Sequence, residues 1–202
     1  MAKAKIKPGI GTDRGRARRA AILEAAIEVV ARDGTGALTH RAVAKLAKVP
    51  LAATTYYFAS RDDLLLEAFK HLTARRMAAY DAAFAILPDR LSAEVAAAGW
   101  AHALAELLRN EPAAVVGEFE MHLEASRRPE LRAIHLAWET KAMDYLAAGM
   151  KAIGSKKPAV DAALVLAVLT GLEIGEIVNP TANAERELLA PLLRRLLHAL
   201  VP

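Results

Sequence analysis

Apolar residues recur every three or four positions along most of the chain, and Gly or Pro interrupts this pattern at intervals. Stretches such as residues 20–31 hold neither Gly nor Pro, and the good helix formers Ala and Leu are abundant. The pattern predicts an all-α protein of about nine helices. They are expected over residues 16–32, 40–47, 51–57, 61–84, 91–109, 112–126, 129–153, 159–178 and 183–200.

The second and third of these helices are short and lie close together in the sequence. Thr39 suits the N-cap position, and Lys48-Val49-Pro50 ends the second helix because proline disfavours helix at the residue before it. Two short helices joined by a turn of three or four residues outline a helix-turn-helix, whose second helix can enter the DNA major groove. We therefore expect a flexible basic arm over residues 1–15, a DNA-binding domain over 16–61 and a larger helical domain over 62–202.

Charge is distributed unevenly along the chain. Residues 1–61 carry 12 Lys and Arg against 4 Asp and Glu, a net charge of +8, whereas residues 62–202 carry 15 against 19, a net charge of −4. Together these give the +4 of the whole chain. A basic first third favours nucleic-acid binding by a small N-terminal module, although a solvated tail would also raise the local charge.

The sequence contains no cysteine, so neither a disulfide nor a thiolate metal site can form, as is usual in a reducing cytoplasm. The basic N-terminus lacks the apolar core of a secretory signal. The most apolar stretch, residues 162–172, is about half as long as a membrane-spanning helix needs. We expect a soluble cytoplasmic protein that does not enter a membrane.

The segment ILEAAIEVVARDGTGALTHRAVAKLAKVPLAATTYYFASRDDLL, residues 22–65, resembles the N-terminal domain of the TetR family. The family's pattern falls in register, without a gap, on Ile22-Leu23, Ala25-Ala26, Gly34, Thr39, Val43-Ala44, Val49, Phe58, Ser60-Arg61 and Leu64-Leu65. The resemblance implies a TetR-type transcriptional regulator that binds a pseudo-palindromic operator in double-stranded DNA as a homodimer. It further implies repression that is relieved by a small-molecule effector, with residues 62–202 as the regulatory and dimerisation domain.

Three positions depart from the family's pattern. The usual turn glycine is Lys48 here, so either Lys48 adopts a left-handed conformation or the turn differs slightly. Thr55 stands where many members have a phosphate-contacting tyrosine, and Tyr57 stands where a histidine is common. Threonine and tyrosine hydroxyls can still bond phosphates or base edges.

The resemblance also implies which residues contact DNA. Thr39 would offer a phosphate a backbone N–H at the start of its helix, and Arg41 would grip a guanine edge unless it is only a solvated arginine. Small and hydroxyl side chains of the third helix would face the groove, while Lys48 and Arg61 would neutralise phosphates. The predicted DNA-binding residues are Thr39, Arg41, Lys48, Ala52, Ala53, Thr54, Thr55, Tyr56, Tyr57 and Arg61.

Basic residues near the N-terminus could add contacts by following the DNA backbone or the minor groove. They are Lys3, Lys5, Lys7, Arg14, Arg16, Arg18 and Arg19. A basic tail that is only solvated is the alternative.

The last two helices are unusually apolar. The helix over 159–178 is apolar nearly all round, which predicts that it is covered on two sides, and the final helix repeats leucines over a wide face. The TetR resemblance implies that these two helices pair with those of a second copy to form a homodimer. A thick core within one chain is the alternative.

The resemblance places an effector cavity among the helices after the third. We predict that it is lined by residues that combine an apolar body with a polar tip: Trp100, Phe119, His122, His135, Trp138, Tyr145 and Glu173. Core or interface side chains with satisfied polar atoms are the alternative for each of them.

Two other classes of function stay open at this point. An all-helical enzyme is one, because Glu118 and His122 lie at i, i+4 and Glu173 and Glu176 at i, i+3. However, the sequence holds no HExxH motif, no phosphate-binding glycine loop and no nucleophile elbow, and we predict no catalytic residue, metal or cofactor. A dimeric helical adaptor is the other, but it leaves the basic helix-turn-helix unexplained.

Overall fold

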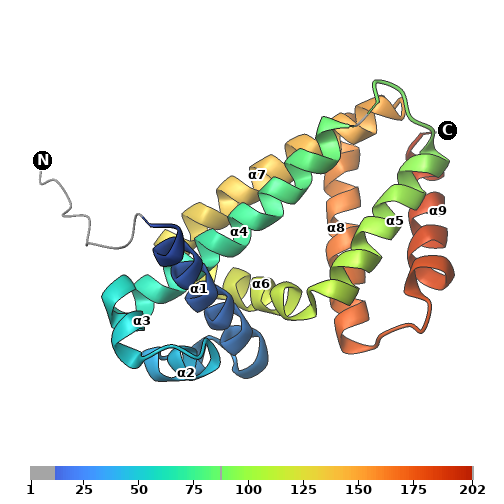
Figure 1. Ribbon diagram of the computed structural model, residues 1–202. Coiled ribbons are helices and arrows are strands. Elements are labelled where there is room, and N and C mark those ends of the chain that lie inside the picture. The colour runs from blue at the N-terminus through green and yellow to red at the C-terminus, as the bar shows by residue number, and fades with distance from the viewer. Residues whose placement is uncertain (1–11, 87, 202) are drawn as a thin grey trace, which may run out of the picture. The chain divides into compact units, whose positions relative to one another are not determined.

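The computed structural model describes residues 12–86 and 88–201 (Figure 1). All regular structure in these ranges is helical, which confirms the predicted all-α fold. The α-helices are α1 (Asp13–Asp33), α2 (His40–Leu46), α3 (Leu51–Tyr57), α4 (Arg61–Ala85), α5 (Ala93–Asn110), α6 (Pro112–Ala125), α7 (Pro129–Ala152), α8 (Pro158–Val178) and α9 (Ala190–Leu200). Of the arm predicted over residues 1–15, residues 1–11 lie outside the described residues.

The chain forms two compact units that do not follow chain order. Unit 1 holds the residues up to Thr73 together with Gly117–Ile134. Unit 2 holds Ala74–Val116 and the residues from His135 onward. Three helices, α4, α6 and α7, therefore run from one unit into the other.

Helix α1 starts earlier than its apolar pattern predicts. Thr12 is its N-cap, and the Thr12 hydroxyl accepts a hydrogen bond from the backbone N–H of Gly15 at 3.1 Å. Gly34, with φ of 78°, ends the helix in a conformation that favours glycine. The sequence prediction began the helix at residue 16 because residues 12–15 show no apolar periodicity.

The core of unit 1 forms where α1, α2, α3 and the start of α4 pack together. Its largest fully buried side chains include Ile22 and Leu23 of α1, Phe58 after α3, and Leu65 and Phe69 of α4. Burying such side chains stabilises a fold by about 1.5–3 kcal/mol each. This core fixes the position of the two short helices that the sequence assigns to DNA.

The second half of α6 belongs to the same unit and approaches α1 closely. A Cβ atom at Gly117 would lie 3.2 Å from Cγ2 of Ile27 and 3.3 Å from the Ile27 carbonyl oxygen. Beyond α6, Arg128 donates to the Asp62 carboxylate at the start of α4 at 2.7 Å. Glycine at position 117 thus permits a contact between helices that a larger residue would obstruct.

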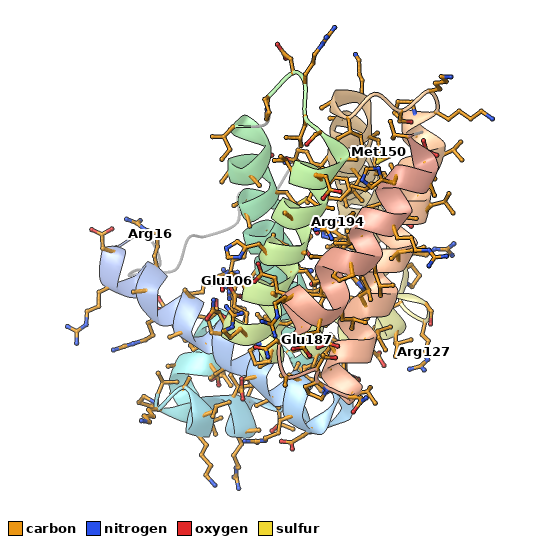
Figure 2. All side chains as sticks on the ribbon, turned by 90° about the vertical axis from the view of Figure 1, so that its right-hand side faces the viewer. Arg16, Glu106, Arg127, Met150, Glu187 and Arg194 are labelled. Carbon is orange, nitrogen blue, oxygen red and sulfur yellow. The ribbon has the colours of Figure 1, made fainter. Side chains whose placement is uncertain are left out.

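Unit 2 has its own core, built mainly by α5 and α9, which lie side by side (Figures 1 and 2). Leu104 of α5, Met150 of α7, Val165 of α8 and Leu193 of α9 are all buried in it. At the surface, Arg194, labelled in Figure 2, donates to the Glu94 carboxylate of α5 at 2.6 Å. A π-helical segment, Glu185–Leu189, leads directly into α9.

Helix α8 is buried on one side only. Val165 and Ala162 enter the unit 2 core, as the near-continuous apolar pattern predicts for one face. The opposite side leaves large apolar residues exposed: Val160, Leu164, Ile174 and Val178. Leu192 of α9 is exposed as well.

Among the described residues, none of the helices combines the length and the apolar character that crossing a membrane requires.

Candidate nucleic-acid interface

Helices α2 and α3 form the predicted helix-turn-helix. Thr39 is the N-cap of α2, and its hydroxyl accepts a hydrogen bond from the N–H of Ala42 at 3.1 Å, as expected from the sequence. Helix α2 ends with Ala47 as its C-cap, and Pro50 precedes α3. Proline at that position supplies the extended conformation from which the next helix starts.

The turn between the two helices passes through Lys48, whose φ is 53°. Of the two possibilities that the sequence leaves open, Lys48 therefore adopts the left-handed conformation. An L-residue there costs about 1–2 kcal/mol relative to ordinary helical backbone. The Lys48 side chain is exposed beside the start of α3.

The exposed side of α3 is formed by small and hydroxyl residues. Ala52 and Thr55 are exposed and Ala53 is half-buried. The Thr55 hydroxyl donates to the Ala52 carbonyl at 3.3 Å, so both lone pairs of its oxygen remain able to accept. Small side chains on this side allow a close approach by another molecule.

Thr54 does not belong to that surface, contrary to the sequence prediction. It is fully buried, and its hydroxyl donates to the Leu51 carbonyl at 2.8 Å. The hydroxyl is thus satisfied by its own helix, and Thr54 packs α3 against unit 1 instead of facing DNA.

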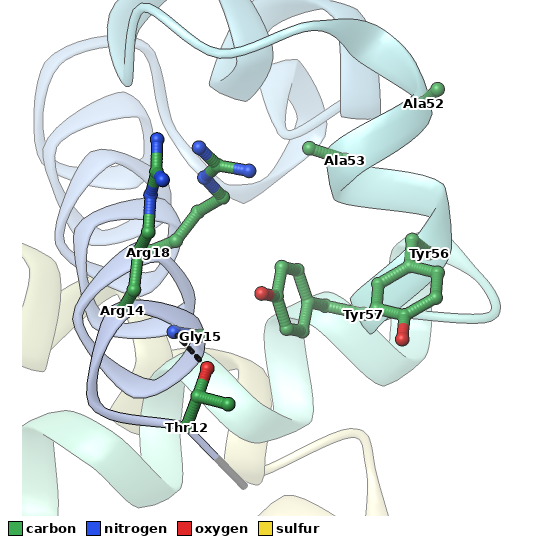
Figure 3. A pocket seen from close by; sticks show the side chains of 8 residues that line it. All are labelled: Thr12, Arg14, Gly15, Arg18, Ala52, Ala53, Tyr56 and Tyr57. Atoms are coloured by element: carbon green, nitrogen blue, oxygen red, sulfur yellow. Dashed lines mark hydrogen bonds between the residues drawn. The ribbon is translucent and has the colours of Figure 1, made fainter. Parts of the chain in front are cut away.

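Tyr56 and Tyr57 are the last two residues of α3. Both are half-buried, and their rings meet edge to face at 5.2 Å. Phe58, by contrast, is fully buried and belongs to the core of unit 1. Figure 3 shows the Tyr57 ring pointing from α3 toward α1.

Arg61, which the sequence analysis assigns to a phosphate, also bonds two backbone carbonyls of its own chain. Its Nε donates to the Leu38 carbonyl at 3.0 Å and its Nη2 to the Thr35 carbonyl at 2.6 Å. Two of its donors therefore tie the start of α4 to the loop before α2. Arg41, in contrast, is an exposed residue of α2.

A groove separates the start of α1 from α3 (Figure 3). Its volume is about 590 Å³, and it is lined by Thr12, Arg14, Gly15, Arg18, Ala52, Ala53, Tyr56 and Tyr57. The sequence prediction included the α3 side and gave Arg14 and Arg18 as possible contacts to the DNA backbone or minor groove, but it placed only Arg18 on a helix. Recognising Thr12 as an N-cap is the one local signal that would have placed Arg14 on the same helix.

The residues predicted to line an effector cavity are divided between the two units. Phe119 and His122 belong to unit 1, where the His122 ring meets Phe69 edge-on at 5.6 Å. The other five belong to unit 2: Trp100, His135, Trp138, Tyr145 and Glu173. Trp100 packs against the unit 2 core.

Within unit 2, aromatic and charged side chains of α4, α7 and α8 gather near one another. The His135 and Trp138 rings stack at 5.9 Å, and Tyr145 meets Tyr80 of α4 at 5.8 Å. Lys141 lies 5.4 Å from the centre of the Tyr145 ring, within the range of a cation–π contact. This part of α7 thus combines ring faces with charge.

Glu173 of α8 is a carboxylate that pairs with α4. Arg76 of α4 donates to it at 3.3 Å, and both side chains are largely buried. Burial raises the pKa of Glu173 above its usual range, although the positive charge of Arg76 opposes that shift. A raised pKa indicates a carboxylate that is not fully compensated by its partner.

Two family descriptions match most of the chain. Residues 22–68 match "Bacterial regulatory proteins, tetR family", and residues 91–199 match "Tetracyclin repressor-like, C-terminal domain". Among proteins with curated descriptions, none matches.

Solved structures match over nearly the full length. A TetR-family member from Streptomyces coelicolor A3 is 32% identical, with a TM-score of 0.69 over 92% of this chain and 98% of that one. The multidrug binding protein EbrR, in complex with ethidium, is 31% identical, with a TM-score of 0.63 over 92% and 99% of the two chains. GusR from Salmonella enterica shares the fold, with 18% identity and a TM-score of 0.73 over 95% and 98% of the two chains.

The matches cover both halves of the chain, and the N-terminal match includes α2 and α3. Regulators of this family are not enzymes, so the enzymatic interpretation of the Glu118–His122 and Glu173–Glu176 pairs does not hold. The chain belongs to the TetR family of transcriptional regulators and binds DNA through its helix-turn-helix.

Proposed function

We propose that the protein is a repressor that binds a pseudo-palindromic operator as a homodimer and leaves it when a small molecule binds the C-terminal part of the chain. The observation that carries this proposal is the outer surface of α2 and α3, where Arg41, Lys48, Ala52 and Thr55 are all exposed. Positive charge, hydroxyl groups and small side chains on a recognition helix suit a major groove.

The exposed apolar side of α8 supports the dimer. Gly171 lies on this side, and a Cβ added there would meet nothing within 4 Å. Ile174 and Val178 follow along the same helix and are likewise exposed. Exposure of such a side to water is unfavourable. Burying it against a second copy would stabilise the dimer by about 25 cal/mol per Å² of apolar surface.

A dimer would also explain how two short recognition helices achieve specificity. Held about 34–36 Å apart, or a multiple of that distance, they would enter successive major grooves on one side of the duplex. An effector that favours another spacing would weaken operator binding, with a coupling of about 1–3 kcal/mol.

For the effector, we propose a planar aromatic cation. The solved complexes of EbrR with ethidium and with proflavin, at 31% and 33% identity to this chain, support this chemical class. So do the residues of unit 2, where Trp138 and Tyr145 offer ring faces and the largely buried Glu173, paired with Arg76, offers a carboxylate. Stacking and a poorly compensated carboxylate are both favourable to a flat cation.

The first experiment selects bound sequences from a random duplex pool with purified protein at physiological salt. Enrichment of a pseudo-palindrome supports the operator-binding dimer, whereas no enrichment by a folded dimer overturns it. Ile174→Glu on the exposed side of α8 should yield monomers. Val95→Glu, at an exposed apolar position on α5, is the matched control and should leave the dimer intact.

The effector needs a separate test because ethidium and proflavin also bind DNA directly. Dye fluorescence is therefore titrated with protein alone, for wild type and for Glu173→Gln. Tight binding that Glu173→Gln weakens about tenfold or more supports the cationic effector. Equal binding by both proteins would remove Glu173 from the proposal, and no binding would remove the dye class.

A further inference from the structure

Four arginines occupy the first two turns of α1, but two of them are already engaged. Arg16 forms an ion pair with Asp13, and Arg19 forms one with Glu67 of α4. The Arg19 guanidinium also lies 5.4 Å from the centre of the Phe58 ring, which holds it against the core of unit 1.

Arg14 and Arg18 differ from these two in position and in partners. They are separated by four residues, so they lie on one side of α1, and both are exposed. Neither makes a hydrogen bond or an ion pair with another described residue. Figure 3 shows both on the α1 wall of the groove that faces α3.

The composition of the groove fits an anion. Its lining has two guanidinium groups and the tyrosine side chains of Tyr56 and Tyr57, and the described residues that line it include no acidic side chain. Two like charges one helical turn apart repel each other mildly, and the attraction of both to an anion lying between them outweighs this repulsion. Ala52 and Ala53 on the opposite wall leave room for a bulky backbone to come close.

We propose that this groove holds a backbone phosphate of the operator, with Arg14 and Arg18 as its paired cations. The inference rests on the proposed function: when α3 enters a major groove, the sugar-phosphate backbone bordering that groove runs along the flank of α3. The α1 wall occupies one such flank. Arginine forks match phosphate geometry, and a tyrosine hydroxyl such as that of Tyr57 can add a donor.

A contact of this kind strengthens binding to every sequence equally. Each phosphate that a protein neutralises adds about 0.9 to the slope of log K against log salt concentration. Because the two arginines share one phosphate, the Arg14→Ala, Arg18→Ala double variant should reduce that slope by about 1, and each single variant should reduce it by no more than that. Operator and random duplex should lose affinity by the same factor.

The test measures binding by fluorescence anisotropy at four or more salt concentrations, with the selected operator and a scrambled duplex of equal length. Lys156→Ala removes one exposed positive charge from the turn before α8 and is the matched control, expected to keep the wild-type slope. Arg14→Lys with Arg18→Lys keeps the charge and should also keep most of the slope. Circular dichroism verifies that every variant folds.

An unchanged slope in the Arg14→Ala, Arg18→Ala double variant, while wild type still binds its operator, overturns the phosphate site and leaves the proposed function intact. A loss of operator affinity with no loss for the scrambled duplex overturns it too, because that result assigns the arginines to bases. Failure of wild type to bind any duplex overturns the proposed function and this inference together.

Discussion

Replacing Gly117 with alanine would place a methyl group where α6 meets α1. The added Cβ would lie 3.2 Å from Cγ2 of Ile27, 3.3 Å from the Ile27 carbonyl oxygen and 3.8 Å from Cβ of Ala31. The carbonyl belongs to the helix backbone and cannot rotate away. Ile27 is buried and β-branched, so its Cγ2 has little freedom to move either.

Two opposing effects set the size of the change. Alanine is favoured over glycine inside a helix by about 1 kcal/mol. Overpacking a well-packed contact costs about 1–3 kcal/mol. We therefore expect Gly117→Ala to lower the free energy of unfolding by about 1 kcal/mol, within a range of about 0–2 kcal/mol.

Gly99 offers a matched control, because it lies in α5 and an added Cβ would meet nothing within 4 Å. Gly99→Ala should raise the free energy of unfolding by about 0.5–1 kcal/mol. Both variants are unfolded in urea at one fixed protein concentration, since a dimer's stability depends on concentration. If Gly117→Ala raised the free energy of unfolding as much as Gly99→Ala does, the argument that α6 is packed tightly on α1 would be refuted.

Three further predictions concern single side chains. Lys48→Gly relieves the left-handed backbone and should raise the free energy of unfolding by up to about 1 kcal/mol in the same urea assay; a lower value would contradict strain at this residue. Arg61→Ala should lower it by about 1–3 kcal/mol, because the Thr35 and Leu38 carbonyls lose a charged donor; wild-type stability would show that these bonds contribute nothing. The raised pKa of Glu173 means that the folded protein holds this proton more tightly than the unfolded chain does. The free energy of unfolding should therefore fall as pH rises from about 4.3 through the raised pKa, and Glu173→Gln should reduce that slope; identical pH profiles would count against the raised pKa.

Helix positions could be predicted from the sequence where local residues fix them. Pro112, Pro129 and Pro158 stand at the first positions of α6, α7 and α8, because proline suits the start of a helix and disfavours its interior. The π-helical segment Glu185–Leu189 has no such local signal, so the prediction ran one helix through it. The start of α1 was missed for a similar reason, since its cap at Thr12 lies among glycines.

The candidate site could be predicted only in part. Helix α3 has seven residues and carries alanine or threonine at four of them, so its sequence shows little contrast between an inner and an outer side. Only packing against the rest of unit 1 decides that Thr54 is buried and Thr55 exposed. Arg61 bonds carbonyls 23 and 26 residues earlier in the chain, a separation that no local pattern reports.

The close contact at Gly117 affects where the N-terminal end of α1, with Arg14, is positioned. Ile27, which bears on Gly117, lies 13 residues from Arg14 along one uninterrupted helix, a distance of about 20 Å. If α1 rocked by about 5° about that contact, Arg14 would move by about 1.7 Å. Such a shift exceeds the tolerance of a hydrogen bond. A small rotation of α1 at the buried Gly117 contact would thus weaken the phosphate contact proposed for Arg14, while the conformation of α3 stayed unchanged.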